Sequence, residues 1–389
     1  MSEYQYYEFQ AIDRPLTAKE MDELRSYSTR ARITPTSFVN DYSWGNFKGD
    51  PDAWMEKYFD AFLYLANWGT HILKIRLPAR LLDPAIARTY CGGENASVRE
   101  KASKVILSFL SEDEESGDWV EGEGHLSSLI SVRAELARGD LRALYLGWLL
   151  RVQNGELDDD DAEPPVPQGL AQLSASLEGL AEFLRIDSDL LPVAAEASSP
   201  MGEVGIDRKD VADWIAKLST REKDKILTSL LVDADQTQVT ELLQSFIKEH
   251  SEGDGKPVTT GRTVGELLRA AEGYATERSR VEAEGRAKAK ARRDREAAIA
   301  REQHLDSLAG RESKLWGEVD ALVTSKQPKS YDRAVAILVD LRDLAARGIA
   351  GDFGIRIEAL REAQAKKTSF IERLRKSGLC GPATTCFPA

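Results

Sequence analysis

Hydrophobic and polar positions in the first 155 residues alternate between strand-like and helix-like patterns. Tyr4–Ile12 alternates polar with apolar residues, which predicts a strand. The capping box Thr17–Glu20 predicts the start of a helix, and Asp50-Pro51 starts another whose apolar residues run on to Leu65. The same patterns predict extended chain over Ile33–Trp44, strands over His71–Leu77 and Val105–Leu110, and helices over Asp83–Cys91, His125–Ala137 and Leu141–Val152. This order indicates a mixed α/β domain over residues 1–155.

The pattern then changes to helices. Residues 156–169, ELDDDDAEPPVPQG, combine four adjacent aspartates with three prolines, and we expect an acidic, proline-rich linker there. Residues 170–250 carry several amphipathic stripes, which predict a small helical bundle. A helical repeat is the alternative, although no side-chain signature recurs at a fixed spacing. The stripes are Leu170, Leu173, Leu177, Leu180 and Leu184; Val211, Trp214, Ile215 and Leu218; Ile226, Leu227, Leu230 and Leu231; and Val239, Leu242, Leu243, Phe246 and Ile247.

The last third is predicted to be helical as well. The capping box Thr263–Glu266 opens a long charged helix over 263–308, in which Thr276–Gln303 has only Val281 and Ile299 as large apolar residues. That composition lacks the apolar heptads of a coiled coil. It favours a solvated helix held by i,i+4 charge pairs, or a helix that finds its partner elsewhere. We predict a C-terminal helical module over residues 309–376 and a disordered tail over 377–389. Together with the mixed domain at 1–155, these helical regions give an α+β fold class.

Composition supports folded cores, because 42% of the residues are hydrophobic and 30% are charged. The net charge of −13 is uneven: acidic residues dominate the first two thirds, whereas 263–376 carry a basic excess. The acidic front disfavours non-specific contact with nucleic acid or anionic lipid. No apolar run is long enough to span a membrane, and the first residues lack a signal sequence. We therefore expect a cytoplasmic protein without membrane contact.

Short catalytic and cofactor motifs are missing from the sequence. It contains no Walker A loop, no dinucleotide-binding glycine pattern, no serine-hydrolase elbow and no zinc-protease helix. Cys91 stands alone, and Cys380 and Cys386 lack zinc-type spacing. We expect no cofactor, no metal and no catalytic residue. One acid/base group remains as a candidate, because His125 follows Glu121 and Glu123, although acids at a helix start also serve the helix dipole.

A basic stretch is the strongest electrostatic feature. Six cations and one acid occupy residues 286–295, and over 276–303 the balance is nine basic to six acidic residues. Several cations could displace counterions from DNA or RNA, but no aromatic residue interleaves them. The alternatives are a solubilising helix, which we favour, or a contact with a protein partner. The cations are Arg286, Lys288, Lys290, Arg292, Arg293 and Arg295.

Aromatic residues cluster near the front of the chain. Most keep helical spacing and predict a core, namely Trp54, Tyr58, Phe59 and Phe62. Trp44 and Phe47 fall in a predicted loop instead, and together they would form an exposed aromatic surface for a protein partner.

Two stretches of sequence resemble known families. The segments YQYYEFQAIDRPLT, SFVNDYSWGNFKGDP and KYFDAFLYLANWGT resemble an uncharacterised bacterial protein family, which brings no known activity. The segment LWGEVDALVTSKQPKSYDRAVAILVDLRDLA is similar to the tail of some bacterial SWIM zinc-finger proteins. The cysteine and histidine ligands of that family are absent, so the resemblance implies a helical assembly module without zinc or DNA binding.

These observations favour a non-enzymatic interaction or scaffold protein with a protein partner. The first alternative is a nucleic-acid accessory protein that uses residues 286–295. The second is an enzyme with an unrecognised site in residues 1–155, which requires a concave pocket around Glu121, Glu123 or His125.

Overall fold

The structure is a computed structural model that describes residues 3–113, 121–202, 207–228, 230–231, 236–250, 258–325, 327–348 and 352–379. The chain divides into two compact units, Met1–Arg278 and Ser279–Ala389. The first unit holds a β-sheet with helices and the second is helical, which confirms the α+β class. No helix among the described residues combines the length and apolar character needed to cross a membrane.

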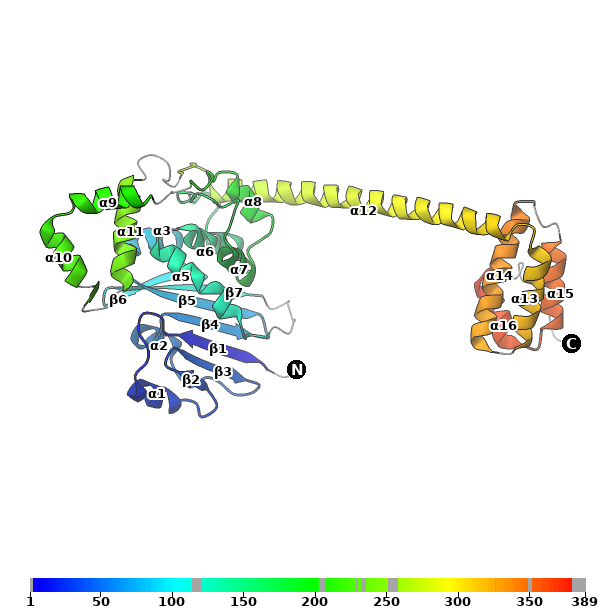
Figure 1. Ribbon diagram of the computed structural model, residues 1–389, viewed down its shortest axis with the longest axis horizontal. Coiled ribbons are helices and arrows are strands. Elements are labelled where there is room, and N and C mark those ends of the chain that lie inside the picture. The colour runs from blue at the N-terminus through cyan, green and yellow to red at the C-terminus, as the bar shows by residue number, and fades with distance from the viewer. Residues whose placement is uncertain are drawn as a thin grey trace. The chain divides into compact units, whose positions relative to one another are not determined.

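The described residues of the first unit form one antiparallel sheet of seven strands in the order β2-β3-β1-β4-β5-β7-β6 (Figure 1). Phe9 stands opposite Phe38 on one side and Phe62 on the other, which fixes the register around the central aromatic residues. The β6–β7 hairpin turns at Ala102 and Ser103, both with positive φ, as a two-residue hairpin loop requires. The strands are β1 (Gln5–Gln10), β2 (Arg32–Thr34), β3 (Ser37–Tyr42), β4 (Ala61–Ala66), β5 (Thr70–Pro78), β6 (Ala96–Lys101) and β7 (Lys104–Glu112).

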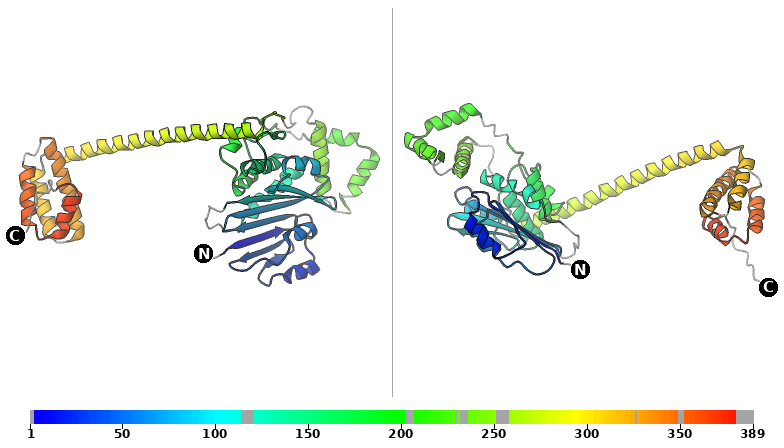
Figure 2. Two further views of the ribbon diagram at one scale, coloured as in Figure 1. Left: turned by 180° about the vertical axis from the view of Figure 1, so that it is seen from behind. Right: turned by 60° about the horizontal axis from the view of Figure 1, so that its bottom comes forward.

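Each face of the sheet carries its own core. Phe9, Phe38 and Phe62 pack with Trp54 under α1 (Ala18–Arg25) and α2 (Pro51–Lys57). The opposite face carries an aliphatic core beneath helices that gather over the β5–β7 half of the sheet (Figures 1 and 2). These helices are α3 (Pro84–Tyr90), α4 (His125–Leu129), α5 (Ser131–Ala137), α6 (Arg142–Gln153), α7 (Ala175–Phe183) and α8 (Leu190–Ala195).

One predicted helix of the front region was wrong. Asp50 and Pro51 start α2 as expected, and Asp50 accepts from the Asp52 and Ala53 amides, but the helix ends at Lys57. Residues 61–66 form strand β4 instead, and all six are buried. A strand buried on both faces has no alternating pattern, so periodicity alone does not separate it from a buried helix. The sequence also failed to predict strand β6. Three of its residues are charged and exposed, so it lacks the regular apolar alternation of a half-buried strand.

The acidic, proline-rich segment 156–169 is not a flexible linker in the structure. Val166 is fully buried, and its backbone pairs with Val258. The backbone carbonyls of Asp159 and Asp161 accept hydrogen bonds from the first amides of the next long helix. Proline excludes helix here, but it does not prevent extended chain from packing. Residues on both sides of the segment therefore share one core, and the expected boundary between 1–155 and 170–250 does not separate two packed bodies.

Helix α12 (Val264–Leu308) matches the predicted long charged helix. Its capping box is present, with Glu266 accepting from the Thr263 amide at 3.0 Å. Val264 and Leu267 are buried in the first unit, whereas every residue from 276 to 300 is exposed. The long helix is thus confirmed and is exposed along this stretch of the chain, and the i,i+4 pair of Arg286 with Glu282 forms at 3.4 Å.

The second unit has a helical core of its own, in agreement with the predicted module at 309–376. Val319, Leu338 and Phe370 are fully buried in it. Leu379 is also buried, so the first residues of the predicted tail belong to this core, while 380–389 lie outside the described residues. The helices are α13 (Glu312–Thr324), α14 (Pro328–Ala346), α15 (Phe353–Ala363) and α16 (Thr368–Lys376).

Candidate functional site

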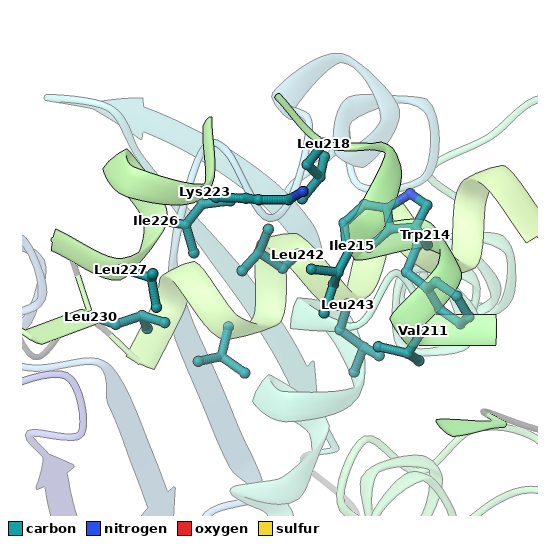
Figure 3. A pocket seen from close by; sticks show the side chains of 12 residues that line it. Val211, Trp214, Ile215, Leu218, Lys223, Ile226, Leu227, Leu230, Leu242 and Leu243 are labelled. Atoms are coloured by element: carbon teal, nitrogen blue, oxygen red, sulfur yellow. The ribbon is translucent and has the colours of Figure 1, made fainter. Parts of the chain in front are cut away.

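An apolar groove of about 450 Å³ lies among three helices of the first unit (Figure 3). The helices are α9 (Arg208–Lys217), α10 (Thr220–Thr228) and α11 (Gln236–His250). Residues spaced i, i+3, i+4 and i+7 come from each helix and its adjoining turn, so three stripes face one cavity. The stripes are Val211, Trp214, Ile215 and Leu218; Lys223, Ile226, Leu227 and Leu230; and Val239, Leu242, Leu243 and Phe246.

Local sequence signals position two of the walls. The Asp207 side chain caps α9 by accepting from the Lys209 amide at 3.0 Å. Helix α9 stops before Leu218, and the capping box of Ser219 with Glu222 starts α10 at once. Each helix is amphipathic, so the direct turn between α9 and α10 brings their apolar stripes to the same side.

Helix α11 forms the floor of the groove and is anchored to the body of the unit. Gln244 donates from its amide to the carbonyls of Leu81 at 3.0 Å and Ala137 at 2.7 Å. Glu241 pairs with Arg80 at 2.6 Å. These contacts use the polar side of α11, so its apolar stripe is left facing α9 and α10.

The predicted amphipathic helices are confirmed here, but their packing is incomplete. Trp214 and Phe246 are buried against each other, edge to face, with ring centroids 5.8 Å apart. By contrast, Leu227 is 57% exposed and Val239 is 53% exposed, and both line the groove. Contiguous exposed apolar residues of this kind are typical of an interaction site.

The basic stretch lies in the exposed part of α12. Arg286 and Arg292 pair with acids one turn away at 3.4 Å, whereas the other four cations have no ion pair within the described part of the chain. Helical spacing divides the six into two opposite stripes, which are Arg286, Lys290 and Arg293 on one side and Lys288, Arg292 and Arg295 on the other. One duplex can therefore contact only about half of them.

The structure does not bring Glu121, Glu123 and His125 into the groove. Glu123 pairs with Arg32 at 3.4 Å on the surface, and His125 opens α4 with its ring 6.3 Å from that of Phe183. No group of three or more His, Cys, Asp or Glu in the described residues could hold a metal ion. Cys91 is buried, and Cys380 and Cys386 lie outside the described residues.

Trp44 and Phe47, the two aromatic residues of the predicted loop, have different environments in the structure. Trp44 is 70% exposed, with the Arg30 guanidinium 5.2 Å from its ring centroid. Phe47 instead stacks on Tyr7 at 4.8 Å and packs against the aromatic core. The expected exposed pair is therefore reduced to Trp44, because the loop folds Phe47 back onto the sheet.

Sequence reasoning missed two polar clusters that long-range contacts create. His71 is buried, and its Nδ1 donates to the Phe183 carbonyl at 2.8 Å while Arg185 donates to its Nε2 at 3.0 Å. Burial lowers the pKa of His71 to about 4, so the neutral ring is favoured. Glu163 is also buried and accepts from Arg262, Thr260 and Tyr145. No local spacing signals either cluster, since the partners lie far apart in sequence.

Comparison with known proteins finds no family model that matches the chain and no curated protein or solved structure significantly similar to it. The two resemblances therefore stay predictions.

Proposed function

We propose that this chain is an interaction scaffold that binds a partner protein in the groove formed by α9, α10 and α11. The observation that carries the proposal is the three apolar stripes that line the cavity and leave Leu227 and Val239 more than half exposed. Exposed apolar area is worth roughly 25 cal/mol per Å² once it is buried, so a partner that covers the groove gains binding free energy.

The geometry suits a helical segment. A helix that docks in a groove presents anchors at i, i+3, i+4 and i+7, which is the spacing of each stripe here. The floor is held by the Gln244 and Glu241 contacts, so binding does not have to build the site first.

A direct test uses a synthetic helical peptide of about 16 residues with one leucine stripe and uncharged glutamine flanks. Binding to the full chain is followed by fluorescence anisotropy of the labelled peptide. We expect saturable binding that Val239→Gln weakens about tenfold, since the substitution removes apolar area from the groove. The matched control is Val281→Gln on α12, where a valine of nearly the same exposure, 54%, lies outside the groove.

The control should leave affinity unchanged within about twofold. Absence of saturable binding, or equal losses in both variants, would contradict the proposal. Val239 is exposed, so its substitution is not expected to unfold the protein, and an unchanged circular dichroism spectrum verifies this.

Nucleic-acid binding by residues 286–295 is the second candidate. Its support is the group of cations Lys288, Lys290, Arg293 and Arg295, which lack ion pairs among the described residues. A salt titration of DNA and RNA binding tests it, because each released counterion adds to the slope of log K against log salt. Replacing Lys290 and Arg293 by glutamine has to lower affinity and flatten that slope, and an unchanged slope rules the candidate out.

A further inference from the structure

The charges around the groove bear on what kind of segment it accepts. Among the lining residues Lys223 alone is charged. Its amine donates to the Ala216 carbonyl at 3.1 Å, which holds it at the rim between α10 and α9. In the described part of the chain no carboxylate pairs with it, so its positive charge remains available to a ligand.

Three acids close to the groove have other partners. Glu222 accepts from the Ser219 amide and hydroxyl at 2.8 and 2.7 Å. Glu241 pairs with Arg80, and Glu249 accepts from the Trp214 indole at 2.7 Å. None of these three carboxylates pairs with Lys223, the one charged residue among those that line the groove.

Helix α9 adds one cation and one acid beside the groove. Arg208 precedes Val211 by three residues and therefore lies on the same side of α9. It has no ion pair within the described residues, and its side chain is exposed. Asp210 precedes Trp214 by four residues and lies on the same side, so the two charges on α9 offset each other, whereas Asp213 points away from the apolar stripe.

We infer that the groove binds an amphipathic helix whose apolar face is flanked by carboxylates, one of which pairs with Lys223. This inference rests on the proposed docking function and adds the charge of the partner. The apolar stripe supplies most of the affinity, whereas the carboxylates set orientation and select against basic helices. Lys223 is thus a specificity-determining residue, and its stem also covers part of the apolar rim.

Three peptides of about 16 residues test the inference on the full chain. They share one leucine stripe and differ only in their flanks, which are glutamate, glutamine or lysine. We expect affinity to fall in that order, with the glutamate peptide bound about tenfold more tightly than the lysine peptide. Near 0.5 M salt the difference should shrink to about twofold, because the Debye length is then only about 4 Å, while the glutamine peptide keeps its affinity.

Two lysine variants test whether Lys223 causes the preference for the glutamate peptide. Lys223→Gln should bring the glutamate and glutamine peptides to within about twofold of each other. Lys225→Gln is the matched control, since this lysine lies two residues along α10 on the opposite side and is exposed. It should leave the ranking intact.

The outcomes separate the two proposals. Equal affinity for all three peptides, or an equal effect of both lysine variants, overturns the acidic partner but leaves groove docking in place. No binding by any peptide overturns docking itself. Self-association of the chain that Val239→Gln abolishes would show that a second copy fills the groove, and it would overturn the acidic-helix inference as well.

Discussion

The indole Nε1 of Trp214 on α9 donates a hydrogen bond of 2.7 Å to the carboxylate of Glu249 on α11. The bond joins the two helices on one side of the groove, where Trp214 also packs on Phe246. Tryptophan has one polar atom, so the bond allows the whole ring to be buried without an unsatisfied donor. The wall formed by α9 is therefore fixed to the floor, and the open side of the groove faces solvent through Leu227 and Val239.

Removing this ring should loosen the groove selectively. Trp214→Ala is expected to cost about 3–5 kcal/mol in the local stability of α9 and α11, because the ring is nearly fully buried. Amide hydrogen exchange in the two helices measures this local free energy. The exposed Trp44→Ala should change it by less than about 0.5 kcal/mol. Similar exchange rates in both variants would show that Trp214 does not hold the groove.

The buried pair of Glu163 with Arg262 should stabilise the start of α12. The Glu163 side chain is fully buried, and the two groups are 2.6 Å apart. Glu163→Gln leaves the guanidinium without its counter-charge and is expected to cost about 3 kcal/mol. The urea midpoint of unfolding, followed by tryptophan fluorescence, reports this loss. As a control, Glu282→Gln removes a solvent-exposed i,i+4 pair with Arg286 and should cost no more than about 0.5 kcal/mol.

Stability should depend on the protonation of His71. Burial lowers its pKa to about 4 in the folded chain, whereas an unfolded histidine titrates near 6.5. Between these values the unfolded chain binds more protons, so this residue makes the folded state less stable as the pH falls from about 6.5 towards 4. The difference in unfolding free energy between wild type and His71→Gln, measured across this range, isolates the effect. A difference that does not change with pH would contradict it.

Two glycine substitutions should have opposite effects although both lie inside helices. A Cβ at Gly147 on α6 would stand 2.6 Å from the Phe109 ring and 3.0 Å from the Cys91 sulfur, in a fully buried region. Gly147→Ala should therefore destabilise the first unit by about 1–3 kcal/mol. At Gly285 on α12 a Cβ meets no atom within 4 Å, and Gly285→Ala should stabilise that helix by about 1 kcal/mol. Thermal unfolding by circular dichroism distinguishes the two, and destabilisation of both would show that α12 is not solvated there.

Local signals predicted much of the fold. The predicted capping boxes at Thr17 and Thr263 are both present, because each depends on residues only three positions apart. Strand β5 was also predicted, since its apolar and polar residues alternate. The long charged helix followed from its capping box and its composition.

The errors came from features that only tertiary contacts decide. Strand β4 has apolar residues at every position, so its type depends on the strands beside it. Residues 156–169 have the composition of a linker, but pairing with residues 258–265 orders them. The three stripes of the groove were visible in the sequence, yet their arrangement around an open cavity was not, because periodicity gives each helix a face without giving it a partner.

A site-specific cross-link tests the central claim most directly. A photoreactive phenylalanine derivative placed at Leu227, inside the groove, should attach covalently to the glutamine-flanked peptide on irradiation, and excess unlabelled peptide should prevent this. The same group at Lys225, on the opposite side of α10, should give little product. Efficient, competed cross-linking from residue 227 alone is the result we predict. Equal cross-linking from both positions, or none from 227, would contradict binding in the groove.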